Sequence, residues 1–457
     1  MAQIFSTCQG FFLDESFFLF YHLIMRYIYA ILFTILLLAH HPALAVSVIR
    51  DTEIEDVVTG WVKSIFKAAH LSPDSAEIVL INDPSINAFV AGGQTIFVHT
   101  GLFTNANSID EIMFVLSHET GHIVGGHITR GIAAMERAQA ATLVSTILGG
   151  VLAVVSGRPD AGIAVMIGSQ GSAMGQFLAY RQTEESSADR TAVDVMTKLG
   201  YSMQGFTDIM KSLRRLELIN DESEKSYLRT HPMTQNRIRD LDRFTKNAPE
   251  VQNNIDFENI KAKLIAFMEK PQDVLLYYKG SSFADRYARA IAYYRQHKLD
   301  QSFQTLDELI KEYPKNPYLY ELKGQFSFEK GMVDQAIQNY EKANQLKPGK
   351  PLIELALAQS YLEKKDKTSA QKALPFLQQA TLQEPDLALA WRLMASAYNY
   401  LGKTPESEYA MVEYERASDK IDAAQKRAKK LLGQLNPSTP YYQRLQDILD
   451  LAKEDHE

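Results

Sequence analysis

Two histidines and one glutamate stand at the spacing of a metal-dependent hydrolase, in the run His118-Glu119-x-x-His122. On a helix, residues four apart lie on one face, so both imidazoles can direct a ring nitrogen at the same metal ion. Glu119, next to the first histidine, is placed to take a proton from a metal-bound water. This combination of residue types and spacing predicts a zinc peptidase.

A third metal ligand must come from another part of the chain, and Glu185 can provide it. Asp189 follows one helical turn later on the same face, and this spacing favours Glu185 over Glu184. Asp189 would then be free to bind the other ring nitrogen of a ligand histidine and to fix its orientation. His127 lies beyond two glycines after His122, so we predict a loop residue rather than a ligand.

The elements that position these residues are predicted to be a buried helix and a sheet. Ser108 and Glu111 have the spacing of a capping box, a strongly apolar stretch follows them, and Gly125-Gly126 ends the helix. Before this helix, the apolar runs within residues 77–99 predict a small antiparallel sheet. We therefore expect an α+β, mostly helical peptidase domain.

The last strand of this sheet is a candidate for substrate binding. An edge strand beside the cleft of a zinc peptidase can pair with an extended peptide through the main chain, whatever the side chains are. The alternative is a hairpin with a purely structural role. The residues given the substrate-binding role are Gln94, Thr95, Ile96, Phe97 and Val98.

Residues 1–45 predict export. Met25-Arg26 is followed by an apolar run and by Ala43-Leu44-Ala45, the order of charged region, apolar region and cleavage site in a signal peptide. We expect a cleavable signal peptide whose translation starts at Met25, and an uncleaved anchor helix is the alternative. The single cysteine, Cys8, lies upstream of that start, so the mature chain would have no thiol, as suits an oxidising compartment.

A second apolar, glycine-rich segment covers residues 141–168. A break at Gly157-Arg158-Pro159 divides it, and each half is too short to span a bilayer. Three interpretations stay open: a buried helical hairpin, a mobile lid near the active site, and a surface that contacts the membrane.

The second half of the chain predicts a repeat array. Pro314, Pro348 and Pro385 each follow an amphipathic helix, and they lie 34 and 37 residues apart. A helix pair that recurs every 34 residues is typical of tetratricopeptide repeats, whose curved array offers a concave face to peptides or partner proteins. We predict about four repeats over 283–418 and capping helices after them, with a non-repetitive helical bundle as the alternative.

Length and composition fit this organisation. At 457 residues, with 46% hydrophobic and 23% charged residues, the chain has the composition of a globular protein of two or three domains. We expect a metallopeptidase domain over 46–268 and an all-α repeat domain over 269–457. The formal net charge of -7, without any long basic run, argues against a nucleic-acid partner.

A third motif, His231-Pro232-x-x-x-x-Arg237, follows the two described above. The three motifs together resemble those of the zinc peptidases related to the CAAX prenyl proteases and HtpX. The resemblance covers roughly residues 49–268 and implies a zincin-like fold. It also implies one zinc ion per chain, with His118, His122 and Glu185 as ligands and Glu119 as the general base.

The same resemblance implies that His231 and Arg237 lie at the catalytic cleft. The likeness to exported family members with C-terminal repeats further implies the hypothesis that His231 is an extra zinc ligand, which plugs the metal and holds the enzyme latent. The open alternative is stabilisation of the oxyanion, because a histidine donor near the developing charge would provide it. Replacing His231 should raise peptidase activity in the first case and lower it in the second.

The architecture resembles that of exported family members of Gram-negative bacteria that act in outer-membrane protein assembly. The resemblance implies a periplasmic endopeptidase, with a chaperone-like role, that degrades misassembled or stalled barrel proteins. Its expected partners are unfolded or misassembled outer-membrane proteins, the barrel assembly machinery through the repeats, and the membrane surface through peripheral contact. The alternatives are a non-proteolytic chaperone or adapter with a latent zinc site, and an integral membrane protease.

Overall fold

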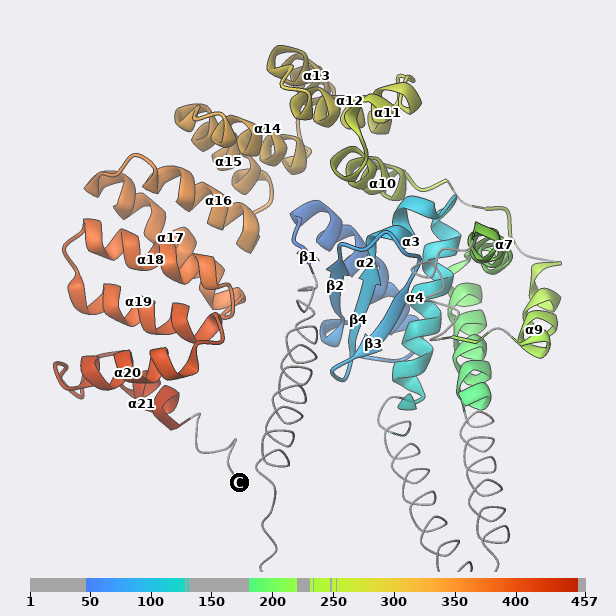
Figure 1. Ribbon diagram of the computed structural model, residues 1–457, viewed down its shortest axis with the longest axis horizontal. Helices are drawn as coiled ribbons and strands as arrows, with labels where there is room; N and C mark the ends of the chain where they lie inside the picture. The colour runs from blue at the N-terminus through green and yellow to red at the C-terminus, as the bar shows by residue number, and fades with distance from the viewer. Residues whose placement is uncertain are drawn as a thin grey trace, which may run out of the picture. The chain divides into compact units, whose positions relative to one another are not determined.

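The computed structural model describes residues 47–127, 130, 181–219, 231–232, 234–246, 249–251 and 253–450 (Figure 1). The predicted signal peptide, the predicted start at Met25 and the apolar segment 141–168 lie outside the described residues. In the part of the chain that is described, no helix has the length and apolar character needed to cross a membrane.

The first half of the chain contains a four-stranded sheet of mixed direction (Figure 1). β2 and β4 run parallel, whereas β1 pairs antiparallel with β2 and β3 antiparallel with β4. The predicted all-antiparallel sheet is therefore wrong. The reason is that β3 and β4 form a hairpin through Gly92-Gly93, and this hairpin joins β2 by its second strand. In spatial order the strands are β1 (Val48–Ile49), β2 (Glu77–Ile81), β4 (Thr95–His99) and β3 (Ala88–Ala91).

The predicted substrate strand, Gln94 to Val98, is contradicted by this order. Gln94 lies in the turn, and the strand that follows it is an interior strand of the sheet. Residues 95–99 pair with β2 on one side, and residues 95–98 pair with β3 on the other. Because both hydrogen-bonding edges of β4 are in use, a substrate cannot add to it. The strand at this edge of the sheet is β3.

The helix with the two histidines is α4 (Ile109–Val124), and it contacts β3 and β4. Ser108 is its N-cap as predicted, but the Ser108 side chain makes no capping hydrogen bond. The Glu111 carboxylate instead accepts from the backbone N–H of Asn107 at 2.8 Å, so the predicted capping box does not form. Gly125 caps the C-terminus, and Gly126 adopts a φ of +58° that turns the chain away.

The core of the first half is built around α4. Every residue of this helix from Ile109 to Gly121 is buried. Burial of this kind gives His118 a rigid, water-poor surrounding, whereas His122 is partly exposed. The helices that supply the rest of this core or connect to it are α2 (Thr52–Ala68), α3 (Thr100–Asn105), α7 (Gln204–Ile219), α9 (Gln235–Thr245) and α10 (Ile255–Met268), with the short η1 (Pro73–Ser75) after α2.

The second half is an array of helix pairs that begins after α11 (Pro271–Tyr277). Successive pairs begin at residues 283, 317, 351 and 388, and this spacing confirms the predicted tetratricopeptide-type repeats. The third pair is three residues longer than the 34-residue period, and its second helix, α17, has 17 residues. The pairs are α12 (Phe283–Arg295) with α13 (Leu299–Glu312), α14 (Pro317–Glu329) with α15 (Val333–Leu346), α16 (Pro351–Leu362) with α17 (Lys367–Gln383), and α18 (Ala388–Tyr400) with α19 (Thr404–Ala417), followed by α20 (Ile421–Leu432) and α21 (Tyr442–Asp450).

Helix α10 contributes to two hydrophobic cores. Phe257 and Ile260 belong to the core around α4, whereas Ala262 and Ala266 belong to the core of the first repeat helices. A single helix with two apolar faces therefore fixes the repeat array to the sheet domain.

Candidate metal centre and active site

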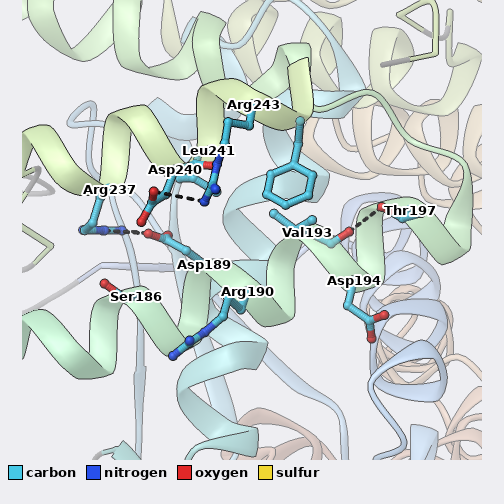
Figure 2. A pocket seen from close by; sticks show the side chains of 11 residues that line it. Ser186, Asp189, Arg190, Val193, Asp194, Thr197, Arg237, Asp240, Leu241 and Arg243 are labelled. Atoms are coloured by element: carbon cyan, nitrogen blue, oxygen red, sulfur yellow. Dashed lines mark hydrogen bonds and ion pairs between the residues drawn. The ribbon is translucent and has the colours of Figure 1, made fainter. Parts of the chain in front are cut away.

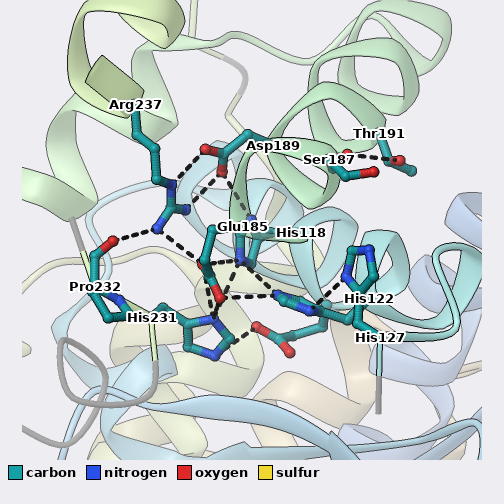
Figure 3. Close-up of polar contacts among 11 residues, drawn as sticks. His118, His122, His127, Glu185, Ser187, Asp189, Thr191, His231, Pro232 and Arg237 are labelled. Atoms are coloured by element: carbon teal, nitrogen blue, oxygen red, sulfur yellow. Dashed lines mark hydrogen bonds and ion pairs between the residues drawn. The ribbon is translucent and has the colours of Figure 1, made fainter. Parts of the chain in front are cut away.

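Four side chains from three parts of the chain converge on one point (Figure 3). His118 and His122 come from α4, Glu185 comes from the helix over residues 181–199, and His231 precedes α9. One donor atom from each residue lies within 4.8 Å of the others. The structure thus brings together the three ligands predicted for the metal, and adds His231 to them.

The distances between the donor atoms fit tetrahedral coordination. His118 Nε2 lies 3.2 Å from His122 Nε2 and 3.3 Å from His231 Nδ1. The Glu185 carboxylate oxygens lie 3.4 Å from His118 Nε2, 3.6 Å from His122 Nε2 and 3.3 Å from His231 Nδ1. Around a metal with bonds of about 2.1 Å, tetrahedral donor atoms are about 3.4 Å apart. Three imidazole nitrogens and one carboxylate directed at the same point are a donor set that suits a zinc ion.

The tautomer of His118 follows from its neighbour Asp189. His118 Nδ1 lies 3.0 Å from Asp189 Oδ1. A carboxylate only accepts, so we assign the ring proton to Nδ1 and the lone pair to Nε2, which faces the donor group. Asp189 therefore occupies the position predicted from its four-residue spacing after Glu185.

The electrostatics of the site favour a bound cation. Burial lowers the pKa of His118, but the carboxylates of Asp189 and Glu185 more than offset it and raise this pKa to about 9. Burial and the neighbouring His118 lower the pKa of His122 to about 2, which keeps its imidazole neutral. Burial opposes the ionisation of Glu185, but hydrogen bonds from His118 and His231 outweigh it and hold the pKa of this carboxyl below its usual value. A metal ion that binds here would meet the anionic carboxylate of Glu185 and the neutral ring of His122, and it would displace the second ring proton of His118.

Glu119 stands beside the donor group rather than in it. Its side chain is 1% exposed, and its Oε1 lies 3.4 Å from His231 Nε2. Burial raises the pKa of the Glu119 carboxyl, although His231 and His118 act in the opposite direction. The ring of His231 thus bridges the two parts of the site, with Nδ1 in the donor group and Nε2 toward Glu119.

Arg237 holds several of these groups at once. Its Nε and Nη2 donate to the two oxygens of Asp189 at 2.7 and 2.8 Å. Its Nη1 lies 2.9 Å from Glu185 Oε2 and donates to the carbonyl of Pro232 at 2.9 Å (Figure 3). Because Pro232 follows His231 directly, one guanidinium fixes two carboxylates and the chain at His231. The sequence grouped Arg237 with the catalytic residues, and these contacts instead indicate a positioning residue.

The crossing of α4 with the helix over residues 181–199 sets the geometry of the donors. The two helices meet at Gly121 and Ala188. A Cβ added to Gly121 would lie 2.7 Å from both the Cα and the carbonyl oxygen of Ala188, well inside van der Waals contact. Ala188 lies between Glu185 and Asp189 in the sequence. Only glycine at position 121 therefore lets these carboxylates approach the histidines of α4 so closely.

His127 is a site residue that sequence reasoning missed. It lies outside the donor group, but its Nδ1 is 3.0 Å from His122 Nδ1. The turn at Gly126 brings the ring back, and Gly125 leaves room for it, since a Cβ there would lie 2.1 Å from His127 Nε2. The glycine pair was interpreted only as a helix end. It also allows His127 to orient the ring of His122 through its second nitrogen.

A cavity of about 450 Å³ lies between the helix over residues 181–199 and α9 (Figure 2). Asp189 and Arg237 line it, and none of the four donor residues does. The apolar part of its lining consists of Val193, Leu241 and Phe244. The cavity therefore reaches the positioning pair and is separate from the donor group.

Comparison with known protein families gives the class to which the fold and the site belong. Residues 49–245, which contain all four donor residues, match the family described as peptidase family M48. Residues 327–397 match a tetratricopeptide repeat family. The chain is a metalloprotease that carries an M48 peptidase domain followed by tetratricopeptide repeats.

Bacterial proteins match the chain over most of its length, and a mitochondrial protein matches a shorter part of it. The chain is similar to the beta-barrel assembly-enhancing protease of Escherichia coli K12, with 25% identity over 356 residues, 76% of this chain and 72% of the relative. The protein of that name from Yersinia pestis is 24% identical over the same shares of the two chains. The mitochondrial metalloendopeptidase OMA1 of Danio rerio is 26% identical over 44% of this chain and 42% of its own.

Proposed function

We propose that this chain is a zinc-dependent endopeptidase of the periplasm of a Gram-negative bacterium, acting in the quality control of outer-membrane protein assembly. Its proposed substrates are misassembled or stalled barrel proteins. The name of the bacterial relatives supports a role in barrel assembly, and the four converging donor atoms support zinc-dependent hydrolysis. We place the division between peptidase and repeat domains at residues 268 and 269, where α10 ends.

The proposed ligands of one zinc ion are His118, His122 and Glu185. When bound, zinc polarises a scissile carbonyl and lowers the pKa of a water molecule. Glu119 would take a proton from that water and return it to the leaving amine nitrogen. Asp189 keeps the His118 proton on Nδ1, and Arg237 holds the carboxylates in place.

His231 is proposed as a plug that keeps the enzyme latent. The support is its position, with one ring nitrogen in the fourth donor place and the other 3.4 Å from the general base. The ring of His231 would then occupy the fourth position at the zinc, where the water must bind, and would also lie against Glu119, which activates this water. An oxyanion donor should instead face the substrate carbonyl while leaving the donor place open.

The proposed site of substrate pairing moves from β4 to β3. β3 is the edge strand of the sheet on this side, and it contacts α4. An extended peptide added to β3 would gain main-chain hydrogen bonds independent of its sequence. This suits an enzyme whose substrates share exposed, unpaired chain rather than one cleavage motif.

A second candidate function is that of an assembly chaperone or adapter that acts through the repeats. The observation that favours it is the engagement of the fourth donor place by His231. The expected partners are outer-membrane proteins and the machinery that assembles them, and peripheral membrane contact is proposed as well. Sodium carbonate extraction separates peripheral contact from an integral protein, since only a peripheral protein is released.

The deciding experiment compares His231→Ala, Glu119→Gln and the double variant on an unfolded protein substrate. His231→Ala should cleave faster than wild type, and the other two should not cleave. The double variant is the matched control, because it shows that the gained activity uses this site. Loss of cleavage in His231→Ala with intact metal binding would contradict the plug. In cells, full rescue of a deletion phenotype by Glu119→Gln would favour the chaperone function.

A further inference from the structure

The N-terminal turns of α2 lie against the repeat array through a line of polar contacts. Glu53 accepts from Tyr287 Oη of α12 at 2.8 Å. Asp56, one turn later, accepts from Tyr318 Oη of α14 at 2.9 Å. Acidic side chains of the peptidase domain therefore contact donors from successive repeats, and the two ends of this line differ in burial.

The inner end is a fixed anchor. Lys263 Nζ lies 2.7 Å from Asp51 and 3.1 Å from Glu53, and the Lys263 side chain is 5% exposed. Tyr287, the third partner, is fully buried. Separating buried charges of this kind is strongly unfavourable, because the remaining partner is left without compensation. Through Tyr287 of α12, which donates to Glu53, this end holds the array to the sheet domain.

The outer end is an accessible carboxylate cradle made of Tyr318, Lys347 and Lys350. Lys347 Nζ lies 2.8 Å from one oxygen of Asp56, and Lys350 pairs with the other oxygen. Lys347 also donates to Tyr318 Oη at 2.6 Å, so the donors support one another. The lysine side chains are 33% and 31% exposed. Burial opposes the ionisation of Asp56, but hydrogen bonds from Lys347, Lys350 and Tyr318 outweigh it and lower the pKa of this carboxyl.

All three donors of the carboxylate cradle belong to the repeat array, whereas the carboxylate that they hold belongs to the other domain. Tyr318 is in α14, Lys347 follows α15 and Lys350 precedes α16. A cavity of about 340 Å³ opens beside Asp56, and Lys350 and Lys63 line it. Glu55 and Glu384 also line it, and Arg50 pairs with both of these carboxylates. A segment of another chain can therefore reach Asp56 and Lys350, one donor of the carboxylate cradle, from this cavity.

We propose that the carboxylate cradle is a binding site for an acidic segment of a partner protein, and that Asp56 is its internal substitute. The exchange replaces one carboxylate by another, so the cradle keeps the same charge-assisted hydrogen bonds. Asp56 competes with the partner's carboxylate for the same donors. Because Asp56 belongs to the same chain, its effective concentration at the cradle is in the millimolar range. Binding of a partner is then weak while Asp56 is in place. This inference does not depend on the proposed peptidase activity.

The test is fluorescence anisotropy with a labelled octapeptide of alternating glutamate and glycine, using the full mature chain. Asp56→Asn vacates the carboxylate cradle and should bind this peptide roughly tenfold or more tightly than wild type. Asp334→Asn is the matched control, because Asp334 also pairs with a lysine, is 79% exposed and lies outside the cavity. A peptide with lysine in place of glutamate should bind none of these proteins.

Replacing the two lysines of the carboxylate cradle gives a second, independent test of the binding site. Lys347→Gln/Lys350→Gln should lose binding of the acidic peptide, both alone and combined with Asp56→Asn. The proposal is overturned if Asp56→Asn binds no more tightly than Asp334→Asn. It is equally overturned if the lysine variants still bind the acidic peptide. Thermal unfolding of each variant, compared with wild type, establishes that the proteins measured are folded.

Discussion

Replacing Gly121 by alanine probes the helix crossing that positions the metal donors. The new Cβ would lie 2.7 Å from two backbone atoms of Ala188, and backbone cannot rotate aside as a side chain can. Ordinary contact between carbon atoms begins at about 3.5 Å, so the helices must separate by roughly 0.8 Å. Glu185 moves with Ala188, whereas His118 and His122 move with Gly121.

A shift of this size exceeds what a metal site tolerates. Metal–ligand distances stay within about 0.2 Å of their ideal values, so Glu185 would leave bonding range or the site would distort. We expect the zinc affinity of Gly121→Ala to be about 10–100-fold lower than that of wild type, the range seen when the orientation of a ligand is disturbed. The overpacked crossing should also lower the free energy of unfolding by about 1–3 kcal/mol.

The assay is a competition titration of zinc against a chromophoric chelator, with thermal unfolding of the same samples. Gly60→Ala is the matched control, because Gly60 also lies within a helix and a Cβ there meets nothing within 4 Å. The control should keep wild-type affinity and gain about 0.5–1 kcal/mol of stability. Wild-type zinc affinity and stability in Gly121→Ala would refute the role assigned to the crossing.

Three further predictions follow from the same contacts. Asp189→Asn should lower zinc affinity about 10–100-fold in the same titration, because the amide no longer fixes the Nδ1 proton of His118; unchanged affinity contradicts this. His127→Ala should also weaken zinc binding, while the urea unfolding midpoint of the metal-free protein stays near that of wild type. A clear fall of that midpoint would indicate a packing role for His127 instead. Lys263→Met should lower the free energy of unfolding by about 3–5 kcal/mol in urea, since Asp51 and Glu53 lose a buried cation, and a loss below about 1 kcal/mol would refute the anchor.

Local patterns were sufficient for the features that depend on helical spacing. His118 and His122 share a face of α4 because they are four residues apart, and the structure places Glu185 with them, as the spacing of Glu185 to Asp189 predicts. The helix pairs of the array were predictable because each repeat uses the same short-range periodicity. In each case the relevant neighbours lie within a few turns in the sequence.

The remaining features depend on contacts between distant segments, which local patterns do not specify. Nothing in the run from Thr95 to His99 indicates that β2 pairs along one edge of it, so an interior strand was taken for an edge strand. The partners of Arg237 became visible only when α9 was placed beside the helix over residues 181–199. The contact of Asp56 with the array joins residues nearly 300 positions apart and has no sequence signal of its own.

The most direct test of the account is zinc X-ray absorption spectroscopy on the wild-type protein and on His231→Ala. For wild type we predict one zinc ion per chain with four nitrogen or oxygen ligands, three of them imidazoles. In His231→Ala the imidazole number should fall to two, with a water oxygen in the fourth place and a gain of peptidase activity. Two imidazoles in both proteins, or zinc bound elsewhere, would contradict the assignment of His118, His122, Glu185 and His231 as one metal site.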